Sequence, residues 1–403
     1  MVYVQDIDGK PMMPTTRHGK VRRLLKANKA TVVNLCPFTI QLTYKSTDHK
    51  QPVTLGIDAG AKHIGFSATT EKEELFACET ILRTDIVDLL STRSQNRRTR
   101  RSRLRYRKPK FNNRVFSKKK GWVAPSVKQR IDSHLNEVNE IHKILPITKI
   151  VIEAAQFDTH KMKNPNISGI DYQNGEQLGF WNVREYVLFR DGHKCSYCKG
   201  KSKDLILNIH HIESRKTGGD SPSNLITLCE TCHKEYHKGN IDLKVRRGKS
   251  LCGAAIMGIM KWRLYDELKS RYSNVSMTFG YITKYNRIKY GIEKSHTSDA
   301  FVISKNFNAK RIEYQYLKRL VRRHNRQIHK MKILKGGKKK NNQAPFEVFG
   351  FRLFDKVLYN NEINFIYGRR KSGNFNIRDF NGENPKDVSY KKLKLIRGKR
   401  HPI

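Results

Sequence analysis

Short apolar stretches bounded by turn residues predict β-strands along much of the chain. Residues 51–85 contain three of them, in PVTLGIDAGAKHIGFSATT and ELFACETILR, with a glycine-rich turn after the first. These three strands follow one another directly, as in a β-meander. ITKIVIEAA at 147–155 predicts a short buried strand that ends at Glu153, and NVSMTFGYITK at 274–284 predicts a further strand.

Apolar residues with the period of an α-helix predict three helices between these strands. The helix at 126–145 is expected to be capped by Ser126 and closed by Pro146. Its apolar stripe consists of Val127, Ile131, Leu135, Val138 and Ile141. GAAIMGIMKWRLYDELKSR at 253–271 predicts the second helix, and HTSDAFVISK at 296–305 begins the third.

The two ends of the chain predict small separate modules. PMMP at 11–14 is incompatible with a helix, and a short basic helix at 20–27 precedes two strands, ATVVNL and FTIQLTY. ILKGGKKKNNQ at 333–343 predicts a flexible basic linker. Aromatic and polar residues alternate between turn signals at 346–390, which predicts a small β-rich domain of hairpins.

Charge changes this picture more than composition does. The 403 residues include 81 Lys plus Arg against 36 Asp plus Glu, a formal net charge of +45. A chain this basic repels itself and is expected to act beside a polyanion. No apolar run approaches the ~18 residues of a membrane span, and the first ten residues do not resemble a signal peptide. Charge alone leaves both a nuclease and a non-enzymatic RNA-binding protein open.

The basic residues are concentrated between the first strands and the first helix. Lys and Arg occupy 14 of the 28 positions at 93–120, and no acid occurs between 89 and 131. Like charges four residues apart oppose one another in an isolated helix, so such a helix is stable only among phosphates. The alternative is a solvated or disordered basic segment. The residues expected to contact nucleic acid here are Arg97, Arg98, Arg100, Arg101, Arg103, Arg105 and Arg107.

Four of the seven cysteines form two CxxC pairs, Cys195 with Cys198 and Cys229 with Cys232. Two such knuckles match a tetrahedral structural zinc site and not a disulfide framework. The zinc would hold together a module that is too short to have a core of its own.

Histidines and one asparagine lie between and after these knuckles. His210 and His211 are adjacent on a predicted strand and point to opposite faces, and His233 and His237 share one helix face. With Asn224 they form a pattern that resembles the HNH, or ββα-metal, nuclease motif over about 60 residues. The resemblance implies that His211 is the general base and that Asn224 orients it through the loop backbone. It also implies that His210, His233 and His237 hold one Mg²⁺. The alternative is a second structural zinc without catalysis.

Three acids lie far apart in the chain: Asp58 in LGIDAG, Glu153 in IVIEAA and Asp299 in HTSDA, three residues after His296. In this order around an HNH insertion, they resemble a RuvC-type nuclease with an RNase H-like fold split in three. With PMMP in front, the arrangement is similar to that of the IscB family of transposon-associated RNA-guided nucleases, over nearly the whole chain. The resemblance implies that Asp58, Glu153 and Asp299 bind two Mg²⁺ and that His296 activates water or completes the metal shell.

The resemblance predicts an α/β multidomain protein: a split RNase H-like mixed sheet, an inserted ββα-metal HNH module, an Arg-rich bridge helix and a small β-rich C-terminal domain. The expected segments are an N-terminal module at 1–50, RuvC parts at 51–88, 125–178 and 249–332, a bridge helix at 89–124, HNH at 179–248, and a C-terminal domain at 333–403. The last would contact a short target-adjacent DNA motif and the RNA through residues that include Arg369 and Arg370, unless these belong to a merely solvated basic face.

The function that the resemblance implies is RNA-guided cleavage of double-stranded DNA. HNH would cut the guide-paired strand and RuvC the displaced strand. The partners would be a guide (omega) RNA and the target DNA, bound by a protein monomer in a prokaryotic, nucleoid-associated cytoplasmic ribonucleoprotein. Two alternatives stay open at this point: an unguided HNH endonuclease of a mobile element, and a non-catalytic RNA-binding protein.

Overall fold

The computed structural model describes residues 1–47, 49–103, 121–154, 162, 165–169, 176–214, 219–246, 248, 251–322, 332–333, 339–340 and 345–397. The chain divides into two compact units, one formed by Met1–Ala155 with Ile259–Ile403 and the other by Gln156–Gly258. The first unit therefore consists of two stretches of chain that are separated in the sequence by the second.

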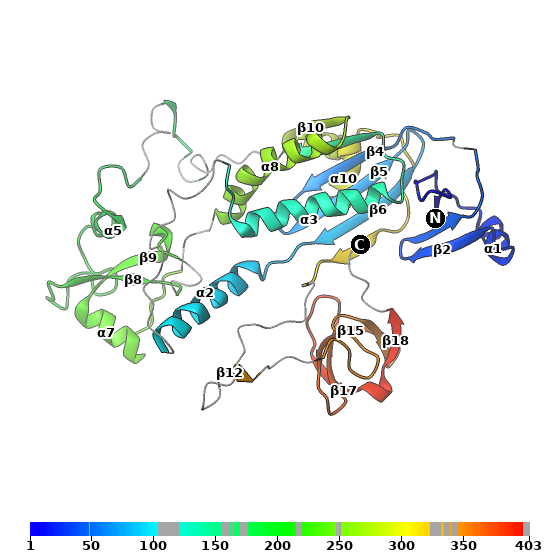
Figure 1. Ribbon diagram of the computed structural model, residues 1–403. Helices are drawn as coiled ribbons and strands as arrows, with labels where there is room; N and C mark the ends of the chain where they lie inside the picture. The colour runs from blue at the N-terminus through cyan, green and yellow to red at the C-terminus, as the bar shows by residue number, and fades with distance from the viewer. Residues whose placement is uncertain are drawn as a thin grey trace. The chain divides into compact units, whose positions relative to one another are not determined.

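A six-stranded sheet is the centre of the first unit, with the strand order β10-β7-β4-β5-β6-β11 (Figure 1). Strands β4, β5 and β6 are the antiparallel meander that the sequence predicted, whereas β7 pairs parallel with β4, β10 with β7, and β11 with β6. The strands are β4 (Thr54–Ala59), β5 (His63–Thr69), β6 (Glu74–Ile81), β7 (Lys149–Ala154), β10 (Val275–Phe279) and β11 (Tyr316–Arg319).

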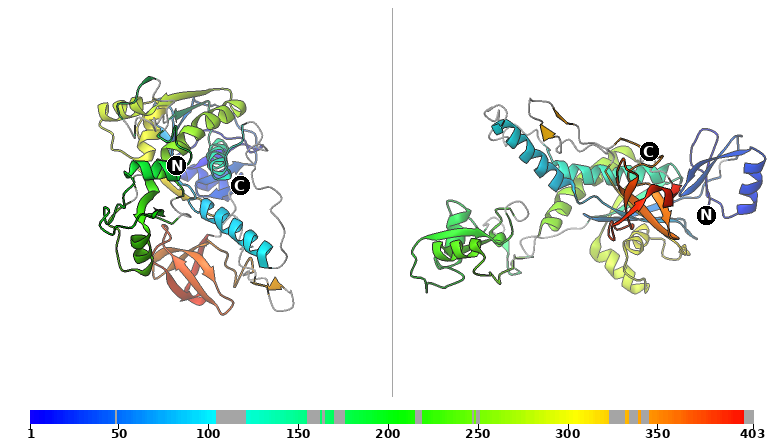
Figure 2. Two further views of the ribbon diagram at one scale, coloured as in Figure 1. Left: turned by 90° about the vertical axis from the view of Figure 1, so that its left-hand side faces the viewer. Right: turned by 90° about the horizontal axis from the view of Figure 1, so that it is seen from below.

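Helices cover both faces of this sheet (Figure 2). On one face Glu137 of α3 accepts a hydrogen bond from Lys318 at 2.8 Å. On the other face α10 packs so closely that a Cβ on Gly56 would lie 2.0 Å from the Ala300 carbonyl oxygen. The helices of this unit are α2 (Ile86–Arg103), α3 (Pro125–His142), α8 (Cys252–Arg271), α9 (Gly280–Lys289) and α10 (His296–Ser304).

Two sequence predictions need correction here. Helix α3 begins at Pro125 with Ala124 as its N-cap residue, so Ser126 does not cap it; proline suits the first helical position because the amide it lacks would be unpaired there. The predicted strand at 274–284 ends at Phe279, and α9 begins at Gly280, where a Cβ would lie 3.1 Å from an oxygen of Glu153.

The N-terminal module has its own small core. A three-stranded sheet of order β1-β3-β2 packs against α1, and the buried side chains are Val2, Val21, Ala30, Ile40 and Leu42. The Tyr3 hydroxyl donates to the Leu75 carbonyl oxygen at 3.0 Å and so links this module to the central sheet. The elements are β1 (Tyr3–Gln5), α1 (His18–Lys26), β2 (Ala30–Leu35) and β3 (Phe38–Leu42).

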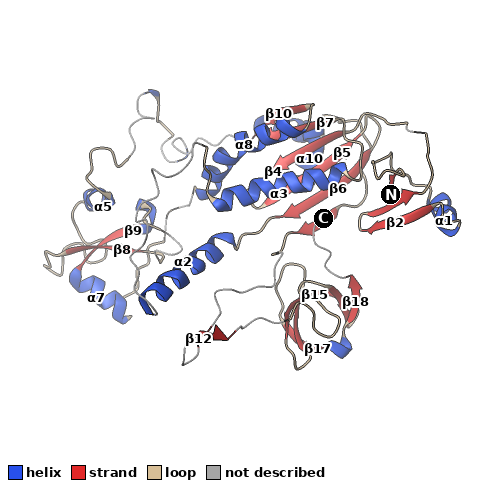
Figure 3. Ribbon diagram, in the orientation of Figure 1, coloured by secondary structure: helices blue, strands red, loops and turns tan. Residues whose placement is uncertain are grey.

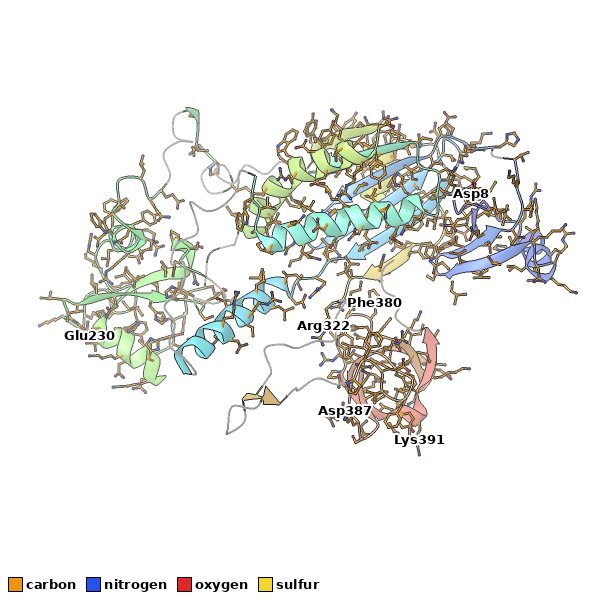
Figure 4. The ribbon with its side chains drawn as sticks, in the orientation of Figure 1. Asp8, Glu230, Arg322, Phe380, Asp387 and Lys391 are labelled. Carbon is orange, nitrogen blue, oxygen red and sulfur yellow. The ribbon has the colours of Figure 1, made fainter. Side chains whose placement is uncertain are left out.

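The C-terminal domain is a five-stranded antiparallel sheet of order β17-β16-β15-β14-β18, as the hairpin pattern predicted (Figure 3). Arg319 of β11 donates to the Phe380 carbonyl oxygen of this domain at 2.8 Å; Phe380 is labelled in Figure 4. The predicted linker contains a short antiparallel pair, β12 (Lys332–Ile333) with β13 (Lys339–Lys340). The domain's strands are β14 (Lys356–Tyr359), β15 (Glu362–Arg369), β16 (Asn374–Arg378), β17 (Lys386–Ser389) and β18 (Lys394–Arg397).

The described part of the second unit contains an antiparallel strand pair and the short helices α5 and α7. Strand β8 pairs with β9 so that His210 lies opposite Ile226, and α7 follows β9 directly, beginning at Glu230. The elements are α5 (Val183–Arg190), β8 (Leu207–His211), β9 (Leu225–Cys229) and α7 (Glu230–Lys238). No helix in the described ranges of either unit has the length and apolar character needed to cross a bilayer.

Candidate functional site

A row of side chains crosses the central sheet on one face. Ile57 of β4 pairs in parallel with Ile152 of β7, so the next residues, Asp58 and Glu153, stand side by side and point to the same face. On the other side of Asp58 its partner on β5 is Gly65. Two acids that are 95 residues apart in the sequence thus become neighbours through strand pairing.

Helix α10 lies directly over this row because glycine leaves room for it. A Cβ on Gly65 would lie 1.9 Å from the His296 carbonyl oxygen. That separation is too short for a real Cβ, so only glycine fits at this position. The helix begins at His296 because the Ser295 hydroxyl accepts a hydrogen bond from the Ser298 amide at 3.0 Å. The sequence prediction that His296 and Asp299 share a helix is confirmed.

The contacts within this cluster join the helix to the sheet. His296 Nδ1 lies 2.7 Å from Asp58 Oδ2, and Asp299 pairs with the Arg287 guanidinium of α9 at 3.2 Å. The hydrogen bond to Asp58 raises the pKa of His296. In the described part of the chain, the carboxylate oxygens of Asp58, Glu153 and Asp299 do not all lie within 4.8 Å of one another.

The acids of the cluster are held at an electrostatic cost. Burial raises the pKa of Glu153, and the nearby Asp58 and Asp299 raise it further. Burial and Asp58 likewise raise the pKa of Asp299. Half-buried carboxylates that repel one another are stabilised by a cation, and carboxylate oxygens are donors that suit Mg²⁺. The donor set of this site therefore fits the predicted ion.

Two further residues lie in the same row and were missed by the sequence analysis. Glu79 of β6 pairs with Gly65, and its carboxylate lies 2.8 Å from His63 Nδ1. The rings of His63 and His296 stack in parallel at 5.1 Å between centroids. The available signal was weak: Glu79 is the second acid, after Glu74, in the mainly apolar strand ELFACETI.

In the second unit, the four predicted cysteines come together. The sulfur atoms of Cys195, Cys198, Cys229 and Cys232 all lie within 4.8 Å of one another. Burial and the neighbouring thiols raise the pKa of Cys232, so four thiolates could not coexist there without a cation. The donor set and its spacing fit a structural zinc ion.

Three of the predicted histidines also form one group. His210 on β8 and His233 and His237 on α7 place ring nitrogens within 4.8 Å of one another. His210 is only 6% exposed, and its buried Nε2 has no hydrogen-bond partner. Burial and the two other histidines lower the pKa of His210 to about 4, which keeps it in the neutral form that binds metals.

The donor chemistry of this trio bears on the predicted ion. Imidazole nitrogens suit divalent ions of the first transition row, whereas Mg²⁺ prefers oxygen ligands. The orphaned Nε2 of His210 fits a metal ligand, but an all-nitrogen trio does not favour the predicted Mg²⁺. The site fits an ion such as Zn²⁺ or Mn²⁺ better.

His211 lies on the opposite face of β8 from His210, and its Nε2 contacts Asp220 Oδ1 at 3.0 Å. Asn224 is fully buried. Its side-chain oxygen accepts from the Glu213 amide at 2.8 Å, and its amide group donates to the carbonyl oxygens of Glu213 and Gly219 at 3.0 and 2.9 Å. Asn224 therefore fixes the loop that follows His211. Asp220 was missed because it lies in a turn without a motif of its own.

The structure describes the side chains of only some of the arginines that were predicted to contact nucleic acid. Arg97 is exposed on α2, which begins at Ile86, before the expected bridge segment. Four other predicted arginines lie on this helix, and the structure describes only their backbone: Arg98, Arg100, Arg101 and Arg103. The remaining two, Arg105 and Arg107, lie outside the described residues.

Arg369 was wrongly predicted to be a surface contact. It is 8% exposed, and its guanidinium donates to the carbonyl oxygens of Phe346 and Phe351 at 2.6 and 3.0 Å and of Pro345 at 3.1 Å. The planar guanidinium donates to three backbone carbonyl oxygens of the segment that precedes β14, so the residue is structural. Arg370, by contrast, is exposed and pairs with Asp387 at 3.3 Å.

Comparisons with known proteins agree with this geometry. Residues 195–239 match the family described as HNH endonuclease, and residues 2–175 match the family described as RRXRR protein. The strand pair, the helix and the histidines of the second unit thus define an HNH endonuclease domain, which is by class a nuclease domain. Each match covers less than half of the chain, and the match to the HNH endonuclease family supports the HNH part of the resemblance seen in the motifs.

Individual relatives match parts of the chain at low sequence identity. Anaredoxin of Nostoc sp. is 29% identical over 66 residues, which are 16% of this chain and 84% of that protein. Streptococcus thermophilus Cas9 in complex with the AGAA PAM is 14% identical with a TM-score of 0.32, covering 46% of this chain and 26% of that one. The type II-C Cas9 of Actinomyces naeslundii is 12% identical with a TM-score of 0.26, covering 64% and 60%. The chain therefore spans about a quarter of the length of the first of these Cas9 proteins.

Proposed function

We propose that this protein is an RNA-guided DNA endonuclease with two independent active sites. The observation that carries the proposal is the row on the central sheet, in which Asp58 and Glu153 stand side by side beneath the helix of His296 and Asp299. We further propose that this sheet is the RNase H-like fold of a RuvC nuclease, split into three by the intervening segments. The mixed strand order around a three-stranded meander supports that assignment.

At the sheet site, we assign three residues as metal ligands and one as the general base. Asp58, Glu153 and Asp299 would hold two Mg²⁺, which stabilise the charge that develops on the attacking and leaving oxygens of the phosphodiester. His296 would accept the proton of the attacking water, and its contact with Asp58 orients the ring. Arg287, now paired with Asp299, offers a cation to the phosphate group beside the site.

In the HNH domain, His211 would take the proton from the water that attacks the second strand. An ionised carboxylate only accepts hydrogen bonds, so the contact with Asp220 places the hydrogen of the neutral ring on Nε2 and leaves the lone pair on Nδ1. Asn224 holds the loop backbone next to this histidine. His210, His233 and His237 would hold the divalent ion that stabilises the leaving oxygen.

The nucleic-acid partners follow from charge and from the family. We propose that α2 lies along a guide RNA, that the C-terminal domain at 333–403 contacts a short adjacent DNA motif, and that a single protein copy acts in the complex. The net charge of +45 supports a large phosphate-rich partner. Base pairing of the guide would select the target, while the protein holds the heteroduplex through its backbone.

The test is strand-resolved cleavage by the purified ribonucleoprotein, with each DNA strand labelled separately. Asp58→Asn is expected to abolish cutting of the displaced strand alone, and His211→Ala to abolish cutting of the guide-paired strand alone. Matched controls are Asp8→Asn and His193→Asn, which change exposed residues that belong to neither proposed site. Loss of both cuts by either single change, with binding intact, contradicts two independent sites. Cleavage by protein without RNA would instead support an unguided endonuclease.

A further inference from the structure

His296 has two further neighbours besides Asp58, and neither has a role in the proposed reaction. The rings of His63 and His296 stack, and the Glu79 carboxylate lies against His63. Ligand atoms of His63, Glu79 and His296 all lie within 4.8 Å of one another. We propose that these three residues form a binding site for a transition-metal ion, distinct from the Mg²⁺ site, and that its occupancy inhibits cutting at the sheet site. The inhibitory part rests on the proposed function, whereas the binding part does not.

The strand register brings the three ligands together. Glu79 and Gly65 are partners on β6 and β5, and His63 lies two residues before Gly65 on the same face. Gly65 has no side chain, so nothing on β5 separates Glu79 from the helix above. His296 of α10 lies directly over Gly65, since its carbonyl oxygen would lie 1.9 Å from a Cβ at that position.

The donor set selects the kind of ion. Two imidazoles and one carboxylate suit Zn²⁺ and its first-row neighbours, whereas the three carboxylates of the proposed Mg²⁺ site suit Mg²⁺. In a tetrahedral zinc site with bonds of about 2.0–2.1 Å, ligand atoms are roughly 3.4 Å apart. Rotations of these side chains would close the observed separations to that value. Their side chains are accessible to an ion from solvent, with exposed fractions of 37% for His63, 20% for Glu79 and 43% for His296.

The same geometry explains why binding would inhibit. His296 now reaches Asp58 through Nδ1 at 2.7 Å. A metal ion between His63 and Glu79 would draw the His296 ring toward them and occupy its lone pair, so the ring could no longer accept a proton at the neighbouring site. One histidine would thus be shared between an active and an inhibited arrangement.

The first experiment measures binding by the full-length protein, without any cleavage assay. Zn²⁺ is titrated against a chelating dye, and the bound ions per chain are counted. His63→Ala and Glu79→Gln are each expected to remove one site, weakening it more than about 100-fold, since loss of an outer-shell partner alone costs about 10–100-fold. The control His18→Ala changes an exposed histidine of α1 and should remove none. His237→Ala should remove a different site, so that its effect adds to that of His63→Ala.

The second experiment measures nicking of the displaced strand at constant Mg²⁺ while Zn²⁺ is raised. Inhibition should occur over the range in which the new site fills, and it should shift to at least tenfold higher Zn²⁺ in Glu79→Gln. Equal zinc counts in the parent protein, His63→Ala and Glu79→Gln would overturn the site, whatever the cleavage results. A normal count with no effect on nicking would overturn the inhibition. Absence of displaced-strand nicking in the parent protein at any Zn²⁺ would contradict the proposed function instead, and would leave the binding result standing.

Discussion

Replacing Gly65 by alanine tests the sheet site more sharply than removing a catalytic group does. The new Cβ would lie 1.9 Å from the His296 carbonyl oxygen and 2.4 Å from its carbonyl carbon. Since real Cβ atoms essentially never come closer than 3.0 Å to such atoms, the two backbones must separate by about 3.0 − 1.9 = 1.1 Å. Neither contact can be relieved by rotating a side chain, so α10 or β5 must move.

The expected magnitude follows from this displacement. A misplacement of about 1 Å at a reacting group costs about 100-fold in rate. The 2.7 Å contact of His296 with Asp58 would be lost over such a distance. Overpacking in a well-packed core also costs about 1–3 kcal/mol of stability. Gly65→Ala is therefore expected to slow nicking of the displaced strand about 100-fold in a protein that still folds.

Gly56→Ala is the matched control, because it separates the effect on the site from the effect on stability. Its Cβ would meet the same helix, 2.0 Å from the Ala300 carbonyl oxygen and 2.8 Å from the Ser304 amide, but more than one turn beyond His296. The loss of stability should be similar in the two variants, and the loss of nicking should be smaller in Gly56→Ala.

The assay is single-turnover cleavage with separately labelled strands, alongside thermal unfolding of both variants. Cutting of the guide-paired strand serves as the internal control, because the HNH histidines lie in the other unit. Equal loss of both cuts in Gly65→Ala would refute the reasoning. So would equal loss of displaced-strand nicking in Gly56→Ala, or unchanged nicking in Gly65→Ala at reduced stability.

Three other predictions concern the stability of separate parts. Cys229→Ser should lower the zinc content by one ion per chain and make the HNH domain sensitive to limited proteolysis, while Cys36→Ser, an exposed cysteine, should do neither. Burial lowers the pKa of His134 from 6.5 to about 4, so on acidification the unfolded chain takes up this proton before the folded protein does. The free energy of unfolding should therefore fall by about 3 kcal/mol between pH 6.5 and 4. Urea unfolding measures this fall, which should be smaller in His134→Gln. Arg369→Ala should lower the melting temperature with RNA affinity unchanged in the protein that remains folded, whereas Arg370→Ala should leave the melting temperature unchanged.

Local patterns were enough to predict the residues whose neighbours lie close in sequence. The helix that carries His296 and Asp299 and the two cysteine knuckles need only short spacings, so the sequence revealed them. Glu79 becomes part of the site only through the register of β5 with β6 and the passage of α10 over Gly65, and neither has a signature in ELFACETI.

The wrong predictions share a physical cause as well. In the sequence, Arg369 looks like one of several surface cations. Its guanidinium instead donates to backbone carbonyl oxygens inside the C-terminal domain. The segment at 274–284 is apolar and β-prone throughout, yet the strand stops at Phe279 because the chain must turn away at Gly280, beside Glu153. In both cases a tertiary contact overrides the local preference.

The point of insertion explains how one chain can carry two candidate sites whose donor sets differ. Strands β7 and β10 are parallel neighbours in the sheet, with Ile150 opposite Val275, so the chain must leave the sheet after β7 and return before β10. A parallel pair needs a crossover of a dozen residues or more in any case, and the cost of closing a loop rises only slowly with its length. The HNH domain enlarges a connection that the sheet already requires, and it brings four cysteines whose donor set fits zinc, which would substitute for a large core. Loss of zinc should therefore unfold the insert and leave the row formed by Asp58 and Glu153 intact.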